Sequence, residues 1–365
     1  KFTKKDSFFM NLALRLARSR HGFTGVNPSV GCVIVKNDKI ISIGQTGFNG
    51  VPHAEYNAIN NCNESLKNSK LYVTLEPCNH YGKTQPCTKY IINKKINEVY
   101  YSIEDIDKKV KGKSYNILKS KNILVKKGLL SKDILSFYEP YFFNRKKKLP
   151  YVTGKIAMSK NNLIYSENNK KITDISSDKL THFLRYKNDS IMISSNTLNN
   201  DNPKLSCRLK RLNEFSPKRI ILDKFLETKI NSYIFKSANK KNTIIFYNKA
   251  NKEKLLKFKR KGITLIKFSL NNDNFFNLNL ILKKLYKLGC RNLLVESGEK
   301  LSNSFLKKKL FDQFYLFKSN KKFSKLFKYK EFNSFNYLSQ NYKNKSKIDL
   351  YKGKDMVYLY KKKYV

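Results

Sequence analysis

The N-terminal part of the chain alternates segments of helical apolar spacing with short apolar runs that are typical of strands. Residues 7–20 place apolar side chains on one helix face, and Asp6 or Ser7 is expected to cap that helix. A further helix is predicted near 113–119. The predicted strands are residues 30–35, 40–43, 71–75, 98–103 and 123–125. Such alternation favours an α/β domain with helices on both faces of one sheet.

A second series of elements follows the charged segment 144–149, which precedes Pro150 and is interpreted as a linker. Beyond it, the predicted elements are strands at 151–158, 190–194, 219–222, 243–247, 264–268, 292–296 and 311–317, helices at 174–186 and 275–288, and a terminal hairpin of 348–351 with 356–360. A chain of 365 residues suggests two domains, on a prior of ~150 residues for each. We predict them at 1–145 and 150–365.

The composition adds a strong positive charge to this picture. Lys and Arg number 75 against 27 Asp and Glu, which gives a formal net charge of +48. Such a charge is typical of proteins that bind nucleic acid. The basic residues are mostly Lys, however, spread along the chain with abundant Asn, Ile, Phe and Tyr and no Trp. Because these residues have A/T-rich codons, genome composition explains the charge at least as well, and we expect no specific nucleic-acid partner. A functional surface for polyanions is the alternative.

Apolar residues make up 40% of the chain, which is enough for real hydrophobic cores. No apolar run approaches the ~18 residues of a membrane-spanning helix, and the first residues lack the apolar segment of a signal peptide. The six cysteines are too few and too irregularly spaced for a disulfide scaffold. These features predict a cytoplasmic protein with reduced thiols and no contact with a membrane.

One stretch of the first domain carries the residue types that bind zinc. His53 follows Pro52 at an expected helix start, Glu55 lies two residues later, and Cys78 and Cys87 follow a predicted strand. The order H-x-E, P-C and a further cysteine is typical of zinc deaminases, in which the glutamate is the general acid/base and not a ligand. We therefore predict that His53, Cys78 and Cys87 bind zinc and that Glu55 is catalytic.

The local structure at Cys78 and the number of zinc ligands are each open to two interpretations. Pro77 is expected to begin a turn or a second helix that presents Cys78. A helix N-terminus lowers the pKa of a thiol and so favours the thiolate that zinc binds. A catalytic zinc site uses three protein ligands, whereas a structural site uses four. His80 is the obvious local fourth ligand, so a structural zinc site is the alternative.

The spacing of the cysteines narrows the class of deaminase. Eight residues lie between Cys78 and Cys87, where nucleoside and nucleic-acid deaminases have two. This longer interval, together with Asn27-Pro28-Ser29-Val30-Gly31-Cys32-Val33-Ile34-Val35, resembles the riboflavin-biosynthesis deaminase. That enzyme is usually the N-terminal half of a bifunctional deaminase–reductase. The resemblance implies a cytidine-deaminase-like domain with three α/β/α layers.

The resemblance also implies which loop residues recognise the substrate. The positions that match substrate contacts are Asn27, His80, Lys83 and Asp105, with Lys83 near the substrate phosphate. The family often has a histidine seven residues before the zinc histidine, and this chain has Thr46 there. Some substrate binding is therefore expected to be lost or replaced.

The second half resembles the riboflavin reductase domain, which has a dihydrofolate-reductase-like α/β fold and uses NADPH. The supporting segments are Lys155-Ile156-Ala157, Ser194-Ser195-Asn196-Thr197, Asp201-Asn202-Pro203 and Val295-Glu296-Ser297-Gly298. The resemblance implies that Asp201 acts near the hydride transfer, with substrate contacts at Asn169, Arg185, Leu205, Arg208 and Glu296 and cofactor contacts at Ala157, Lys171, Thr197, Asp201, Lys224 and Gly298. A guanidinium suits the substrate phosphate, and the strand–Gly–helix step at Gly298 offers backbone N–H groups to a cofactor phosphate.

Several positions of this second site depart from the family. Lys171 replaces the usual tryptophan, Asn169 a serine, and Lys224 a small hydroxyl residue near the cofactor. Asn202 replaces the second acid of a D-D-P step. A reductase domain that has lost its activity is therefore an alternative.

The sequence thus predicts a bifunctional enzyme of riboflavin synthesis with zinc and NADPH as cofactors. The first domain is expected to remove the 2-amino group of a 2,5-diamino-6-ribosylamino-pyrimidinone 5′-phosphate, and the second to reduce the ribosyl group to ribityl. The alternatives are a deaminase with an eroded reductase domain, a nucleic-acid-editing deaminase, and a zinc-stabilised binding protein. The expected partner is the small pyrimidine phosphate, and a homo-oligomer is open.

Overall fold

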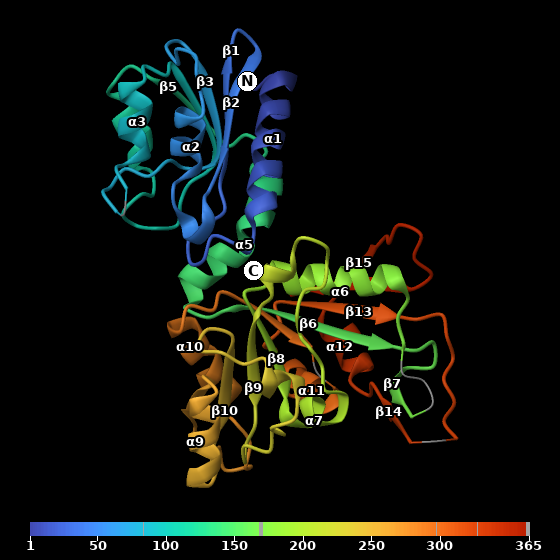
Figure 1. Ribbon diagram of the computed structural model, residues 1–365. Helices are drawn as coiled ribbons and strands as arrows, with labels where there is room; N and C mark the ends of the chain where they lie inside the picture. Colours follow the sequence, from blue (N-terminus) through green and yellow to red (C-terminus); the bar gives the residue numbers. More distant parts are fainter. Residues whose placement is uncertain (83, 168–170, 297, 327, 363–365) are drawn as a thin grey trace. The chain divides into compact units, whose positions relative to one another are not determined.

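The computed structural model in Figure 1 describes all residues except 83, 168–170, 297, 327 and 363–365. The chain divides into two compact units, Lys1–Lys148 and Leu149–Val365. Each unit has a large sheet and buried apolar clusters of its own. Each therefore has the core that an independently folding domain needs.

The first unit is built on a five-stranded sheet in the order β2-β1-β3-β4-β5. Its strands are β1 (Gly31–Lys36), β2 (Lys39–Gln45), β3 (Lys70–Leu75), β4 (Glu98–Ile103) and β5 (Leu124–Lys127). β1 pairs antiparallel with β2 and β3, whereas β3, β4 and β5 run parallel. Asn37 and Asp38 close the β1–β2 hairpin with positive φ, which these residue types tolerate. The five strands predicted from the sequence are confirmed.

Helices cover both faces of this sheet, as the alternation predicted. They are α1 (Lys4–Arg20), α2 (Ala54–Asn60), α3 (Cys87–Asn93), α4 (Lys113–Lys119) and α5 (Ser131–Lys147), with a 3-10 turn η1 (Phe48–Gly50). In Figure 1, α1 and α5 lie on one face of the sheet and α2 and α3 on the other. Thr3 caps α1, and not Asp6 or Ser7 as predicted. The Thr3 hydroxyl accepts the Asp6 N–H, and the Asp6 carboxylate accepts the Thr3 N–H.

The segment interpreted as a linker is in fact the last turn of a helix. Residues 144–147 belong to α5, which packs against β4 and buries Tyr138 and Asn144. The interpretation was wrong because a run of basic residues also suits the C-terminal end of a helix, where the helix dipole is negative. The boundary between the units falls directly after Lys148.

The second unit is built on a nine-stranded sheet in the order β11-β10-β9-β8-β12-β6-β13-β16-β15. Its strands are β6 (Tyr151–Met158), β8 (Ser190–Ser194), β9 (Lys218–Leu222), β10 (Thr243–Tyr247), β11 (Thr264–Lys267), β12 (Asn292–Glu296), β13 (Gln313–Lys318), β15 (Asn344–Ile348) and β16 (Met356–Lys361). The strands from β11 to β13 run parallel, and β16 pairs antiparallel with β13 and β15. A separate pair joins β7 (Leu163–Ser166) to β14 (Tyr329–Glu331).

The helices of the second unit connect these strands. They are α6 (Ile175–Lys187), α7 (Ser195–Asp201), α8 (Tyr233–Lys236), α9 (Lys252–Arg260), α10 (Leu278–Lys287), α11 (Glu299–Lys307) and α12 (Phe335–Asn341), with a 3-10 turn η2 (Asn213–Phe215). The helix predicted at 275–288 begins only at Leu278, because the Asn277 side chain caps it by accepting the Leu280 N–H. The terminal hairpin is present, but its first strand is β15, which ends where the predicted strand was to begin.

The structure also bears on two predictions from composition. Within the described ranges, no helix combines the length and the apolar character needed to cross a membrane. All six cysteines are free thiols.

Candidate functional site

In the first unit, helix α2 lies directly on strand β2 because a glycine allows the approach. A Cβ at Gly44 would lie 2.2 Å from the Ala54 carbonyl oxygen and 2.4 Å from the Ala58 nitrogen. His53 is the N-cap residue of α2, and Glu55 lies in its first turn with 4% of its surface exposed. The close contact of strand and helix therefore fixes the start of α2, where both functional residues lie.

The two cysteines enter the site from the segment between β3 and α3. Cys78 lies in the loop after β3, and Cys87 is the first residue of α3. Of the turn or second helix predicted at Pro77, the helix is not found: Cys78 lies in a loop, and α3 begins only at Cys87. The Cys87 N–H donates to the Cys78 Sγ over 3.3 Å, and the Thr88 N–H donates to the Cys78 carbonyl over 3.1 Å. The N-terminus of α3 thus holds Cys78 and favours its thiolate.

The three predicted ligand atoms converge on one point. Cys78 Sγ and Cys87 Sγ each lie 3.4 Å from His53 Nδ1, and the three atoms lie within 4.8 Å of one another. A tetrahedral zinc ion, with Zn–S of ~2.3 Å and Zn–N of ~2.0–2.1 Å, sets a nitrogen–sulfur distance of ~3.5 Å. The residues therefore fit zinc closely. His80 is not part of the group, and three protein ligands are the arrangement of a catalytic site.

Hydrogen bonds within the ligand group set the charge state of its members. The hydrogen bond between the two cysteines lowers the pKa of the Cys78 thiol to about 4 and, with burial, raises the pKa of Cys87. The hydrogen bond to Cys78 raises the pKa of His53 to about 9. Burial raises the pKa of Glu55 to about 7, against the effect of the His53 charge. Metal binding displaces such protons, because zinc binds thiolates and neutral imidazole.

A cavity of about 260 Å³ adjoins the ligand group. It is lined by the ligands His53 and Cys78, by Glu55, and by the predicted substrate contacts Asn27, His80 and Asp105. Its size is slightly below the ~300–1,000 Å³ of typical small-molecule sites. Lys83, the fourth predicted substrate contact of this unit, lies outside the described residues. The fold thus gathers the described candidates of the first unit around one cavity.

Asn27 and His80 line this cavity with polar side chains. The Asn27 Nδ2 donates to the Gly50 carbonyl over 3.4 Å, and Gly50 has φ +88°. A Cβ at Gly50 would lie 2.3 Å from the Asn27 Nδ2, so glycine makes room for this side chain. The His80 Nδ1 is buried, and it has no hydrogen-bond partner in the described part of the chain. A buried polar atom of this kind is suited to a bound ligand.

Asp105 is held by a buried carboxylate at the end of β3. Glu76 accepts the backbone N–H groups of Asp105, Gly112 and Ser114 over 3.3, 3.0 and 3.1 Å. The Asp105 Oδ1 in turn accepts the Tyr141 hydroxyl over 3.3 Å. Glu76 therefore fixes the loop that brings Asp105 to the cavity.

Sequence reasoning missed the contribution of α5 to this cavity. Tyr141 and Arg145 line it, although this segment was assigned in part to a linker. A signal was present, because Ile134, Tyr138 and Tyr141 recur at the spacing of one helix face. Thr46 also lines the cavity, and its hydroxyl accepts the Val30 N–H over 2.9 Å.

In the second unit, most predicted cofactor contacts follow the carboxyl ends of parallel strands. Strands β6, β8, β9 and β12 run parallel, so these ends share one edge of the sheet, where ligands bind in such folds. Ala157 lies near the end of β6, and Thr197 is in the first turn of α7, directly after β8. Lys224 follows β9, and Gly298 is the N-cap residue of α11.

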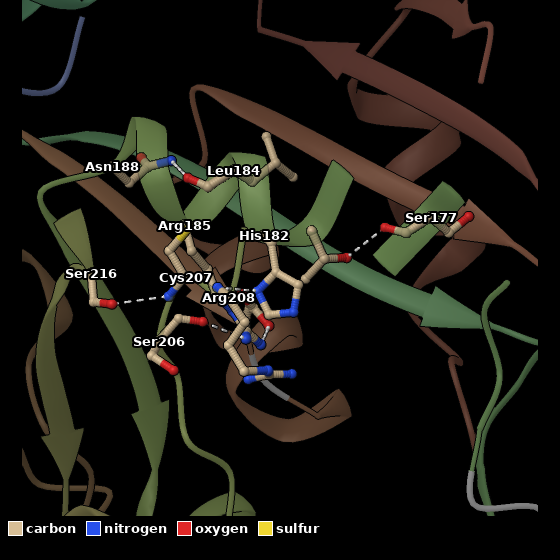
Figure 2. Close-up of polar contacts among 11 residues, drawn as sticks. Ser177, His182, Leu184, Arg185, Asn188, Ser206, Cys207, Arg208 and Ser216 are labelled. Carbon is tan, nitrogen blue, oxygen red and sulfur yellow. Dashed lines mark hydrogen bonds and ion pairs between the residues drawn. The ribbon is translucent and has the colours of Figure 1, made fainter. Parts of the chain in front are cut away.

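Two predicted substrate contacts of this unit bind each other. The Arg185 Nε and Nη2 donate to the two carboxylate oxygens of Glu296, each over 2.8 Å, and the Arg185 Nη1 donates to the Ser206 carbonyl over 3.2 Å. Figure 2 shows Arg185 and His182 projecting from one helix toward the segment from Ser206 to Arg208. The guanidinium is thus oriented before any substrate binds.

His182 was not predicted from the sequence, yet it contacts a predicted residue. Its Nδ1 accepts the backbone N–H of Arg208 over 3.3 Å (Figure 2). Burial, with the charges of Arg185 and Arg208, lowers the pKa of His182 and favours the neutral ring that this acceptor role requires. Leu205, another predicted substrate contact, is buried in the neighbouring core.

The remaining candidates of the second unit are Asp201, Lys171, Lys224 and Asn169. Asp201 is the last residue of α7 and is exposed. Lys171 forms an exposed ion pair with Asp178 over 2.7 Å, and the Lys224 Nζ lies 4.8 Å from the ring centroid of Phe225. Asn169 lies outside the described residues.

Comparison with protein families identifies both units. Residues 3–103 match the zinc-binding region of cytidine and deoxycytidylate deaminases, and residues 150–320 match the RibD C-terminal domain. Over 314 residues the chain is 36% identical to the riboflavin biosynthesis protein RibD of Aquifex aeolicus, with 86% of each chain covered. It is 33% identical over 306 residues to RibD of Actinobacillus pleuropneumoniae, covering 83% of this chain and 81% of the relative.

Solved structures show the same two-part architecture. The deaminase/reductase of Thermotoga maritima superposes with a TM-score of 0.81 and 28% identity, over 98% of this chain and 99% of that one. RibD of Acinetobacter baumannii gives a TM-score of 0.83 and 25% identity, with 98% and 99% coverage. These matches confirm the predicted fold class: a cytidine-deaminase-like domain followed by a reductase domain.

Proposed function

This chain belongs to the RibD family of riboflavin biosynthesis proteins, and on that premise we propose which residues of each unit carry out the two reactions. The chain is a bifunctional enzyme with a zinc-binding deaminase domain and a reductase domain of the NADPH-dependent family. The predicted riboflavin-pathway function, enzyme class and cofactors are therefore confirmed. The roles of individual residues are the subject of the proposal.

In the first unit, His53, Cys78 and Cys87 hold the zinc ion and Glu55 moves protons. When bound, zinc supplies a Lewis acid that lowers the pKa of its water to ~7. The Glu55 carboxylate accepts the proton of the attacking water and returns it to the departing amine, so that ammonia leaves as a carbonyl forms on the ring. Asn27, His80 and Asp105 orient the pyrimidine. The observation that carries this proposal is the buried carboxylate of Glu55 in the first turn of the helix that His53 caps.

In the second unit, Arg185 and Arg208 bind the substrate phosphate and Asp201 acts near the hydride transfer. NADPH supplies the hydride when it is bound. The ribosyl carbon receives that hydride and the ring oxygen receives a proton, which gives the open ribityl chain. The contacts of Arg185 with Glu296 and Ser206 support this assignment, because they fix the guanidinium and leave its remaining Nη N–H groups for a phosphate.

The experiment that tests the whole proposal uses the purified full-length protein. A 2,5-diamino-6-ribosylamino-pyrimidinone 5′-phosphate should release ammonia, and the deaminated product should then drive NADPH oxidation. Ammonia release without NADPH oxidation would indicate that the reductase domain has lost its activity. Absence of both would contradict the proposed substrate.

We also propose the partner and the cellular location of this protein. A pyrimidine ribosyl phosphate is the partner, and the +48 charge reflects composition more than a nucleic-acid target. Specific complexes bind at about 10⁻⁸ M or tighter at physiological salt, whereas bare charge gives ~10⁻⁴–10⁻⁶ M. We expect only weak, salt-sensitive binding to RNA, and tight tRNA binding at physiological salt would contradict this. Free thiols among the metal ligands suit a reducing, cytoplasmic location. The oligomeric state of the protein in solution is to be determined by measurement.

A further inference from the structure

The cavity of the first unit has an uneven distribution of charge. Four carboxylates belong to its lining: Glu55, Glu76, Asp105 and Asp107. Among the described residues of that lining, Arg145 is the only Lys or Arg. A phosphate monoester carries about −1.5 to −2 charges at pH 7. A phosphorylated substrate in this cavity therefore needs a cation, and a guanidinium binds phosphate with two parallel hydrogen bonds.

Arg145 is positioned by its neighbours, yet its charge is not neutralised by an ion pair. It is half-buried in the last turn of α5, with its guanidinium carbon 5.4 Å from the ring centroid of Tyr141. In the part of the chain that the structure describes, no carboxylate lies within ion-pairing distance of Arg145. The nearby Asp105 instead accepts the Tyr141 hydroxyl and the Asp107 N–H. The charge of Arg145 opposes the rise that burial gives to the pKa of Asp105, and without an ion pair the guanidinium still has N–H donors for a ligand.

The position at which the family often has a histidine does not supply this cation. Thr46 is 2% exposed, and its hydroxyl accepts the Val30 N–H over 2.9 Å and donates to the Val30 carbonyl over 3.4 Å. Its hydrogen-bonding capacity is thus used within the sheet. Thr46 therefore offers no charge to the cavity, whereas α5 supplies the guanidinium of Arg145.

We propose that Arg145 binds the phosphate of the pyrimidine substrate in the deaminase cavity and adds to the preference of this unit for a phosphorylated substrate, besides the contact that the resemblance implies for Lys83. The proposal rests on the proposed deamination and names one residue that determines its specificity. The pyrimidine ring lies at His53 and Glu55, and the phosphate lies against α5. Tyr141 acts as a positioning residue, because it stacks on the guanidinium and bonds to Asp105.

The test compares two forms of one substrate: the pyrimidine ribosyl phosphate and the same compound after phosphatase treatment. Arg145→Gln should lower kcat/KM for the phosphorylated form by roughly ten- to a hundredfold, mainly through KM, as expected for a lost charge-assisted hydrogen bond. Turnover of the dephosphorylated form should stay unchanged. Arg145→Lys, which keeps the charge without the planar fork, should recover part of the loss.

Lys146→Gln is the matched control, because it removes one positive charge from the adjacent, exposed residue. It should leave both substrates unaffected, and zinc content should be the same in all variants. Equal losses on both substrate forms in Arg145→Gln would indicate a packing role and overturn the proposal, as would no loss at all. A wild-type protein that deaminates neither form would instead refute the proposed function, and this inference with it.

Discussion

Arg185 and Glu296 form a bidentate ion pair that joins helix α6 to the end of strand β12 in the second unit. Both N–O distances are 2.8 Å, and each side chain is only 11% exposed. Both residues are predicted substrate contacts. The guanidinium is fixed by this pair, so a phosphate bound as proposed would lose less entropy on binding.

Glu296→Gln should destabilise the second unit. The change leaves the Arg185 guanidinium buried without its counter-charge, and breaking a buried ion pair typically costs about 3–5 kcal/mol. Denaturant unfolding of the full chain, followed by a probe in the second unit, measures the change. Glu331→Gln is the control, because it makes the same substitution in the exposed pair with Lys325 and should cost less than about 1 kcal/mol. Equal effects of the two variants would contradict the structural role of the buried pair.

The same pair predicts a pH dependence of stability. Burial alone would raise the pKa of Glu296, but the Arg185 charge and hydrogen bonds bring it below its usual value of 4.5. A carboxyl whose pKa is lowered by folding stabilises the protein above its unfolded pKa and loses that effect as the pH falls. The stability difference between wild type and Glu296→Gln should be constant from about pH 5 to 7 and shrink below about pH 4.5. A difference that grows toward acid pH would show that another group dominates.

Cys87→Ser should abolish zinc binding. The wild-type protein should contain about one zinc ion per chain, because its three ligand atoms form a single site. Elemental analysis of the purified proteins measures the loss. Cys62→Ser is the control, since Cys62 is a half-buried thiol outside the ligand group and should leave the zinc content unchanged. Full zinc retention in Cys87→Ser would rule out the ligand assignment.

Glu55→Gln should stop deamination without releasing zinc. The amide keeps the shape of the buried side chain but cannot accept a proton, and general acid–base groups contribute about 10²–10⁴-fold to rates. Ammonia release should fall by at least that factor while zinc content stays at the wild-type level. Glu64→Gln, a change at an exposed glutamate, should have no effect. Near-normal turnover of Glu55→Gln would argue against its role in proton transfer.

We expect the reductase to reduce its substrate slowly, because its binding of NADPH is weakened. Lys171 replaces an aromatic residue of the family and pairs with the exposed Asp178. Burying a large apolar side chain is worth ~1.5–3 kcal/mol, so Lys171→Trp should lower the KM for NADPH by roughly tenfold.

Arg208→Gln should abolish reduction and Asp201→Asn should strongly reduce it, with Lys210→Gln as an exposed control. No NADPH oxidation even at millimolar cofactor would show that the domain is a relic.

The zinc group was predictable from the sequence because its chemistry is specific and local. Only a few residue types bind zinc, and His53, Cys78 and Cys87 stand at a spacing that few other functions produce. The strands were also predictable, since short apolar runs such as 190–194 coincide with buried strands such as β8. The pattern of the chain thus predicts the class of site.

Contacts between distant segments were not predictable in this way. Arg185 and Glu296 are separated by 111 positions, and nothing in either local pattern indicates that they bind each other. Arg145 was missed for a different reason: the charges around it favoured a linker, while the helix depends on apolar contacts with the sheet. Tertiary packing decided the outcome in both cases.

Glu76 has a consequence for the thermodynamics of the first unit. Its backbone leads directly into the loop of the predicted metal ligand Cys78, while its carboxylate holds the loop of Asp105. One residue therefore connects the two loops. Any coupling of zinc affinity to pyrimidine affinity through Glu76 is reciprocal, because linkage requires that whatever zinc adds to substrate binding, substrate adds equally to zinc binding.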